Sequence, residues 1–508
     1  MRVLSVLVIL SGAVFGQSNR TACSLTPGLA QQYAALPPMP DLTLSFEERM
    51  APRRALAKAY PADWPLQFLL QEPISGQFTL GREWDAAIAH YRSLPDRMLG
   101  EVLEAHLLSG LHKKKSREAL DRAMGQASDS PWVHWAMLAW ATSPLGDGIL
   151  AQKEFEEFRR LCPDDLRVFR YLDSAKQPDR VERHLPVLRR TLEQKKKGTL
   201  DDEDFAQFQK AWRWERVLYA GRAPEFERLV RSDLAVLRAR PRFDFPRWVS
   251  AVRNATQELR DPSAMEALEN EILAMAPTSL AAYHIIEDRW RKQNPTPQSP
   301  QEAPAFEERM MAFHRAQFDR FRGQYFPRHE LHRLLFNPAF KLPLDEVETL
   351  ADAALANAER LPDQGASWPP VEIRVAEVYV NRTLRLGRVP ALVQQGLEQI
   401  EYQEKYRRNA DLYVDQPRGP EGDNVDRVQR RAREILIRHA IITGRKASAR
   451  ALLAEMRRDL EQSKPATAGR REGAWHNRYQ LYLRFATQAG VEAPPIARAA
   501  HTLAAMAS

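Results

Sequence analysis

Cysteine and glycine are scarce in this chain. Its 508 residues include two cysteines, Cys23 and Cys162, and 22 glycines. The two cysteines form no Cys-x-x-Cys pair, so the usual motif for thiol redox chemistry is missing. In an oxidising compartment they either form a disulfide or remain as a surface thiol and a buried thiol, and the sequence leaves both alternatives open.

Motifs for catalysis and nucleotide binding are also missing. There is no Gly-x-Ser-x-Gly nucleophile elbow, no Gly-rich phosphate loop with Lys and Ser/Thr, and no dinucleotide-binding fingerprint. His329 and His332 share one helical face, but no third ligand follows at helical spacing, so we interpret them as partly buried histidines. We therefore expect a protein that is not an enzyme and has no bound metal or cofactor.

No hydrophobic run is long enough to span a bilayer. The first residues instead have the form of a secretory signal peptide, with Arg2 before a short apolar stretch and permissive residues up to Gly16. We expect cleavage after Gly16, leaving Gln17 first. The mature chain is then a periplasmic or secreted bacterial protein without stable membrane insertion.

Neither sign of charge dominates the chain. It has 74 basic and 66 acidic residues, which give a formal net charge of +8. Many opposite charges stand four residues apart in the favourable order, as in Glu156/Arg160 and Glu401/Lys405, and this pattern is typical of solvated helix faces. No groove-reading motif accompanies the basic residues, so we expect no nucleic-acid partner.

Amphipathic helices account for most of the sequence. Ala, Leu, Arg and Glu are abundant, and this composition suits helix interiors better than strands. Beyond Gly81, pairs of amphipathic segments recur, with glycine between the two helices of several pairs and proline after the second. The spacing predicts helices over 99–110, 113–126, 132–141, 150–161, 205–220, 224–240, 248–259, 264–275, 371–386, 390–402, 435–443, 447–460, 475–489 and 495–507. Gly221, Gly387, Gly444 and Gly490 are expected to supply the positive φ at the inter-helix turns.

This helical-hairpin pattern predicts an all-α fold. A hairpin of about 34 residues cannot bury its own apolar face, so successive units stack and share a core. We predict an α-solenoid, a superhelix of stacked hairpins. The expected division is a signal peptide (1–16), a Pro-rich segment (17–65), a first half of the array (66–293), a linker (294–304) and a second half (305–508). One helix is expected in the Pro-rich segment, at 45–60, with Ser45 and Glu48 as a capping box.

Two stretches resemble tetratricopeptide repeats. Leu268-Glu-Asn-Glu-Ile-Leu-Ala-Met-Ala-Pro277 is similar to the end of that family's second helix, and Ile435-Leu-Ile-Arg-His-Ala-Ile-Ile-Thr-Gly444 to its first helix and turn. The full consensus is not met in any single unit. The resemblance implies a solenoid whose concave face holds peptides, other proteins or glycans. The chain also resembles the degenerate repeat arms that precede thioredoxin-like redoxin domains, although no redoxin domain is recognisable in it.

Aromatic and basic residues provide the candidate partner-binding positions. Trp212 and Trp214 point in different directions on one predicted helix, so we expect one of them to be exposed. Segment 313–326 carries an aromatic stripe flanked by Arg315 and Arg322. The other tryptophan groups stand at core spacing. We take Trp212, Trp214, Arg315 and Arg322 as candidate partner contacts.

These observations favour a non-catalytic, exported scaffold that binds a protein or peptide partner. Two alternatives stay open. One is a superhelical or toroidal hydrolase of glycan or cell-wall polymer, which needs a positioned carboxyl pair that the sequence does not reveal. The other is a docking arm of a thioredoxin-like envelope redox system.

Overall fold

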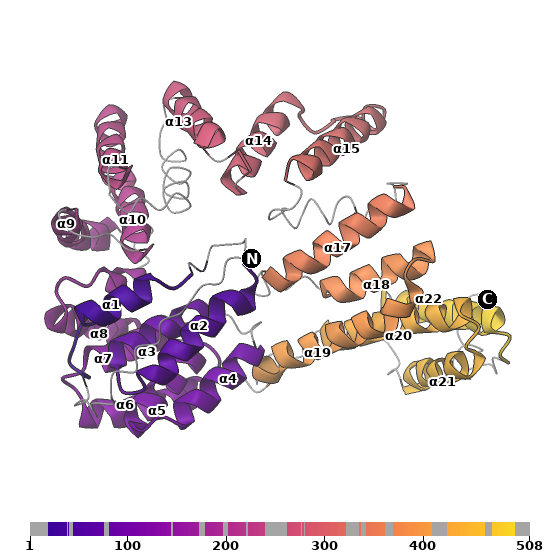
Figure 1. The fold of residues 1–508 in the computed structure, drawn as a ribbon, viewed down its shortest axis with the longest axis horizontal. Coiled ribbons are helices and arrows are strands. Elements are labelled where there is room, and N and C mark those ends of the chain that lie inside the picture. Colours follow the sequence, from indigo (N-terminus) through magenta and orange to yellow (C-terminus); the bar gives the residue numbers. More distant parts are fainter. Residues whose placement is uncertain are drawn as a thin grey trace, which may run out of the picture. The chain divides into compact units, whose positions relative to one another are not determined.

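The computed structural model of the chain is built from α-helices. It describes residues 19–37, 39, 44–75, 81–143, 146–171, 178–196, 202–219, 222–238, 262–275, 277–278, 280–321, 335–336, 342–360, 369–408, 424–462 and 470–492. Within these residues every regular element is a helix and none is a strand (Figure 1), which confirms the all-α prediction. None of the helices described is long and apolar enough to cross a membrane.

The chain divides into two compact units. The first comprises residues 1–38, 49–76 and 83–207, and the second comprises residues 39–48, 77–82 and 208–508. The segment predicted as a linker, 294–304, lies inside the second unit. It follows α14 (Leu280–Gln293), and its last two residues begin α15 (Ala303–Arg320).

The first unit is a set of packed helix pairs. α7 packs against α8 and α6 and also against α5 and α3, so α3, α5 and α7 are neighbours although other helices separate them in sequence. Apolar side chains fill the space between them, and the rings of Phe68 and Trp132 stack at 5.0 Å between centroids. The elements are α1 (Pro27–Ala34), α2 (Phe46–Ala59), α3 (Trp64–Gln71), η1 (Glu72–Ile74), α4 (Gly81–Arg92), α5 (Arg97–Leu108), α6 (Lys113–Gln126), α7 (Pro131–Thr142), α8 (Gly148–Leu161), η2 (Leu166–Tyr171) and α9 (Pro178–Lys195).

The Pro-rich segment is more helical than predicted. It contains α1 and α2 and the first residues of α3, whereas the sequence pattern predicted one helix. The expectation was too low because Thr26-Pro27 and Asp63-Trp64-Pro65 are helix starts, with proline in the first turn, where its missing N–H is harmless. The capping box is confirmed: Glu48 N donates to Ser45 Oγ at 3.2 Å, and Ser45 N donates to Glu48 Oε2 at 2.7 Å.

Residues 19–23 are fastened to the helical body. Cys23 and Cys162 form a disulfide with their Cα atoms 5.6 Å apart, which resolves the alternative that the sequence left open. The carbonyl oxygens of Arg20 and Ala22 accept hydrogen bonds from Ser130 Oγ (2.8 Å) and Trp132 Nε1 (2.7 Å) at the start of α7. Polar contacts and a covalent bond therefore hold this segment to residues more than a hundred positions away.

The second unit contains a layered group of helices at its C-terminal end. α20 packs against α18 and α22, while α19 packs against α18 and α20, and α21 against α20 and α22. α18, α20 and α22 are thus successive neighbours, and α19 and α21 are the second helices of their pairs. The elements are α10 (Asp202–Leu218), α11 (Ala223–Arg238), α13 (Pro262–Met275), α14, α15, α17 (Leu344–Arg360), α18 (Val371–Arg382), η3 (Leu386–Arg388), α19 (Val389–Arg408), α20 (Asn424–Ile442), α21 (Lys446–Gln462) and α22 (Arg470–Ala489).

These three neighbouring helices end in the same way. Leu384 N donates to Tyr379 O at 2.8 Å after α18, Arg445 N to Ala440 O at 2.8 Å after α20, and Val491 N to Ala486 O at 2.9 Å after α22. Each closure contains one residue in the left-handed region: Thr383 (φ 56°), Gly444 (φ 70°) and Gly490 (φ 60°). This is the Schellman pattern, in which a residue after the helix satisfies a carbonyl of its last turn.

The prediction for Gly444 and Gly490 is confirmed, and that for Gly387 is wrong. α18 ends at Arg382, and positive φ occurs at Thr383 and Arg385, while Gly387 lies in the 3-10 turn η3. Ion pairs hold this conformation, because Arg385 donates to Asp352 (2.8 Å) and Glu348 (3.0 Å) of α17. Gly221 and the expected helices 248–259 and 495–507 lie wholly or almost wholly outside the described residues.

Of the three left-handed residues in these closures, Thr383 occupies a position where glycine would be more favourable. A β-branched residue in the left-handed region costs about 1 kcal/mol, and the exposed Thr383 side chain contributes little packing. We expect Thr383→Gly to raise the free energy of unfolding by about 0.5–1 kcal/mol, measured by urea unfolding. Gly444→Ala, at the equivalent position of α20, is expected to lower it by about 1 kcal/mol. A loss of stability in Thr383→Gly would contradict the assignment of strain.

The disulfide closes a long loop, and its removal should destabilise the first unit. The two cysteines are 139 residues apart, so the bond restricts the unfolded chain strongly. We expect the Cys23→Ser/Cys162→Ser double variant to lose about 3 kcal/mol, seen as faster hydrogen exchange of the α5–α8 amides. Dithiothreitol should produce the same change in the unmodified chain and none in the double variant.

Candidate functional site

The candidate partner contacts chosen from the sequence do not gather into one site. Trp212 and Trp214 are 0% and 2% exposed, so the expectation that one of them is exposed is wrong. They lie on different sides of α10, and both sides are covered; Trp212 Nε1 donates to Asp233 Oδ2 of α11 at 2.8 Å. Arg315 is exposed and forms a two-pronged ion pair with Glu346 of α17 at 3.1 Å. Arg322 lies outside the described residues.

The other aromatic stripes belong to the core, as predicted. Trp132 and Trp135 are 1% and 2% exposed, and Phe313, Phe318 and Phe321 are all buried. None of these rings is therefore available to stack on a ligand.

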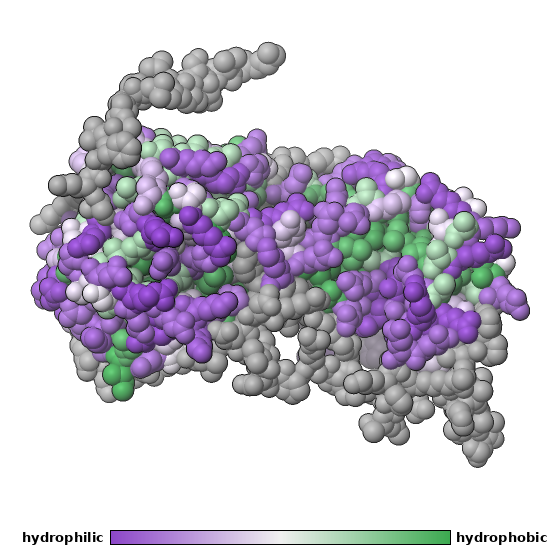
Figure 2. All heavy atoms as spheres, turned by 90° about the horizontal axis from the view of Figure 1, so that it is seen from below, coloured by the Kyte–Doolittle hydropathy of each residue, from purple (hydrophilic) through white to green (hydrophobic). Residues whose placement is uncertain are grey.

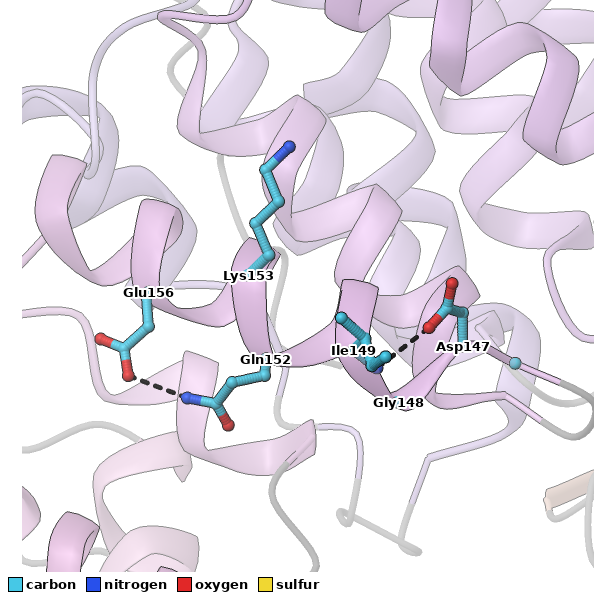
Figure 3. Close-up of a pocket in the computed structure, with 7 residues that line it drawn as sticks. Asp147, Gly148, Ile149, Gln152, Lys153 and Glu156 are labelled. Atoms are coloured by element: carbon cyan, nitrogen blue, oxygen red, sulfur yellow. Dashed lines mark hydrogen bonds between the residues drawn. The ribbon is translucent and has the colours of Figure 1, made fainter.

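The described part of the chain contains no cluster of metal ligands, and its one prominent surface depression has no catalytic arrangement. No group of three or more His, Cys, Asp or Glu side chains is placed there to hold a metal, and His329 and His332 lie outside it. A shallow depression at the start of α8 is open to solvent (Figure 3). Its polar groups are engaged locally, because Asp147 caps α8 through Ile149 N (2.9 Å) and Gln152 donates to Glu156 (2.9 Å). The lining residues are Gly146, Asp147, Gly148, Ile149, Gln152, Lys153 and Glu156.

A histidine and a glutamate, the residue types of a general acid–base pair, are buried together in the first unit. His134 Nδ1 on α7 lies 2.5 Å from Glu154 Oε2 on α8, and His134 Nε2 lies 3.0 Å from Ser128 O. Burial of the imidazole opposes its charge, but the hydrogen bonds to Glu154 and Ser128 and the negative charge of Glu154 outweigh it and raise the pKa of His134. Both ring nitrogens face acceptors and the pair is enclosed, so its role is to join α7 and α8.

A neighbouring histidine has the opposite environment. His106 of α5 lies with Nδ1 2.5 Å from Gln71 Oε1, and Gln71 Nε2 donates to Leu103 O at 2.7 Å. Burial, together with the charge of Arg170, lowers the pKa of His106 to about 3. A neutral His106 therefore joins α3 to α5.

Charged and polar side chains of α18, α20 and α22 lie close together in the second unit. We define the α18–α20–α22 face as Glu377 and Asn381 of α18, Arg431, Glu434 and Arg438 of α20, and Arg478 of α22. Arg431 donates to Glu377 through Nε at 3.0 Å and through a second nitrogen at 2.5 Å. Arg438 donates to Asn381 Oδ1 at 2.8 Å and lies 5.8 Å from the Phe485 ring centre on α22. Hydrogen bonds thus join α20 to α18, and the contact of Arg438 with Phe485 joins α20 to α22.

A carboxyl group lies in the middle of this network. Burial raises the pKa of Glu434, although the positive charges of Arg438, Arg478 and Arg431 act to lower it. Burial also lowers the pKa of Arg478, helped by the charge of Arg430. Arg431 remains accessible, with 46% of its side chain exposed. The face therefore combines half-buried ionic groups with an accessible guanidinium.

Sequence reasoning did not identify this face. Arg431, Glu434 and Arg438 stand at helical spacing on α20, which is the signal that places them on one side. Interleaved charges of this kind are equally typical of a solvated helix, and only the packing of α20 between α18 and α22 turns them into a shared surface. Figure 2 also shows hydrophobic side chains between hydrophilic ones at the surface of the second unit.

Comparison of the chain with models of known protein families and with curated protein sequences gives no match.

The buried His134–Glu154 pair predicts a pH-dependent stability. Because the folded state raises the pKa of His134, the stabilisation is fully present below the unfolded pKa, near 6.5, and is lost as the pH rises through the folded value. We expect the free energy of unfolding of the first unit to fall over this window. His134→Gln should remove the pH dependence and cost about 3 kcal/mol at pH 6, because it leaves Glu154 buried without its ionic partner. An unchanged pH profile in this variant would contradict the assignment.

Proposed function

We propose that the protein is an exported scaffold of stacked helical hairpins that binds a protein partner on the α18–α20–α22 face and catalyses no reaction. The observation that carries this proposal is the pair of arginine contacts from α20 to α18, with Arg438 also lying against Phe485 of α22, on three helices that are neighbours in space but alternate with others in sequence. A surface assembled from successive hairpins is what a repeat architecture offers to an extended partner.

The repeated geometry supports a solenoid of the tetratricopeptide type. The three helices that would line its inner face share the six-residue closure at Tyr379–Leu384, Ala440–Arg445 and Ala486–Val491. α18 is followed by α19 and α20 by α21 in the second layer, and α22 packs against α21, as in helical-hairpin repeats. Within the described residues this regularity is clearest between α18 and α22.

Export is supported by two independent features. The first sixteen residues have the pattern of a signal peptide. The Cys23–Cys162 disulfide is a bond that persists in oxidising compartments. Together they favour a periplasmic or secreted location for the mature chain.

Site-specific photo-crosslinking tests the proposal. A benzophenone side chain at Asn381, which is exposed on α18, should link one defined protein in the exported fraction, which mass spectrometry then identifies. The same group at Ala454, exposed on α21, serves as the matched control and should not link that protein. The purified partner should then bind the unmodified chain and compete with the crosslink.

Two results would overturn the proposal. One is equal crosslinking from Asn381 and Ala454, which would indicate non-specific contact. The other is an unchanged yield of crosslink when Arg431→Glu and Arg438→Glu are combined, because reversing two charges of the face must disturb a partner bound there.

A further inference from the structure

We infer that the α18–α20–α22 face takes an acidic segment of the partner protein, whose side-chain carboxylates accept hydrogen bonds from the arginines of the face, Arg431, Arg438 and Arg478. This inference rests on the proposed function and adds the chemistry of the bound segment. Its support comes from the distribution of charge, the hydrogen bonds of the arginines and the internal carboxylates of the face.

Two of the three helices of the face, α20 and α22, are more basic than the second-layer helices α19 and α21, whereas α18 has two arginines and two glutamates. α20 carries five arginines against one aspartate and one glutamate, and α22 carries four arginines against one glutamate. By contrast, α19 has three basic and three acidic residues, and α21 has four basic and three acidic residues. Positive charge is therefore concentrated on α20 and α22. Arg433 of α20 pairs with Asp459 of α21, and Arg431, Arg438 and Arg478 are the arginines that can attract an anionic segment to the face.

All the cationic residues of α20 and α22 are arginines. A guanidinium is planar, stays charged and offers five N–H donors in a geometry that matches a carboxylate. Lysine would give the same charge without the paired hydrogen bonds. The residue type thus favours recognition of carboxylates over a diffuse attraction.

The arginines of the face retain donors for a ligand. Arg438 uses one nitrogen on the neutral amide oxygen of Asn381. The Nε atom of Arg478 is buried and makes no hydrogen bond with the described residues. Arg431 donates through two nitrogens to a single oxygen of Glu377, which is a less complete pairing than two parallel bonds to both oxygens. A carboxylate of a bound peptide can accept hydrogen bonds from the donors that each of these arginines leaves unused.

The internal carboxylates distinguish an acidic peptide from a uniform polyanion. Glu377 and Glu434 lie among the arginines, so a membrane surface or a polyphosphate would bring negative charge against them. A peptide with spaced carboxylates can place them at the arginines and put neutral residues opposite Glu377 and Glu434. The observations therefore favour a protein segment.

Binding of synthetic peptides to the full chain tests the inference. The probe is a fluorescein-labelled 14-residue peptide with Glu at every third position, compared with the same peptide carrying Gln there. We expect binding of the Glu peptide and at least tenfold weaker binding of the Gln peptide. Arg431→Gln and Arg438→Gln should each weaken binding of the Glu peptide about fivefold, and the double variant about 25-fold. The affinity should fall as salt is raised.

Arg457→Gln is the matched control. It also removes one arginine with an ion pair, to Glu461, but on α21. We expect no more than a twofold change in peptide affinity. Circular dichroism melting of each variant shows whether the fold is retained, and Arg→Lys at 431 and 438, which keeps the charge, should recover part of the affinity.

Several outcomes would overturn the inference. These are equal affinity for the Glu and Gln peptides, no binding of either, equal weakening by Arg457→Gln, or preference for vesicles of phosphatidylglycerol or for polyphosphate over the Glu peptide. Failure of the proposed function is distinguishable from this. If a partner is crosslinked at Asn381 but its affinity is unchanged by Arg431→Gln/Arg438→Gln, the protein binds a partner on this face without recognising acidic residues. Binding of the Glu peptide without any crosslinked protein would retain the carboxylate-binding site and refute the partner-binding scaffold.

Discussion

The apolar side of each helix is too wide for one neighbour to cover. α20 illustrates this constraint, since it contacts α18 and α19 before it and α21 and α22 after it. Its Val428, Ala432 and Ile435 are buried with the α18 and α19 side chains, whereas Ile437 and Ala440 are buried with those of α21 and α22. A single hairpin would leave part of this surface in water, so the pairs are stable as a series.

The same constraint determines where polar groups occur. Polar groups occur both inside the packed helices and at the boundary between core and solvent. His134 and Glu154 are buried between α7 and α8 and compensate each other, which is a structural use of charge. Glu434 and the arginines around it lie nearer to solvent and form a network that remains partly open. The depth of a charged pair below the surface thus distinguishes the buried His134–Glu154 link from the partly exposed groups around Glu434.

Much of the secondary structure was predictable from local patterns. The 3.6-residue period, the Ser45–Glu48 box and the glycines at 444 and 490 determine helix positions through interactions between near neighbours. The end of α18 was not predictable, because Thr383 and Arg385 adopt left-handed conformations that ion pairs with α17 support. The burial of both Trp212 and Trp214 was missed for a similar reason. Amphipathicity assigns one buried side to a helix, and α10 has two. The α18–α20–α22 face needs the order of helices in space, which no single segment encodes.

The bond between Cys23 and Cys162 also changes what a cut in the backbone does. It makes a closed covalent ring of the chain from residue 23 to residue 162, which includes α1 to α8. A protease that nicks any one exposed turn inside this ring opens it without releasing a fragment. The two new ends stay attached to the same molecule, so the nicked helices can reassociate without a search through solution.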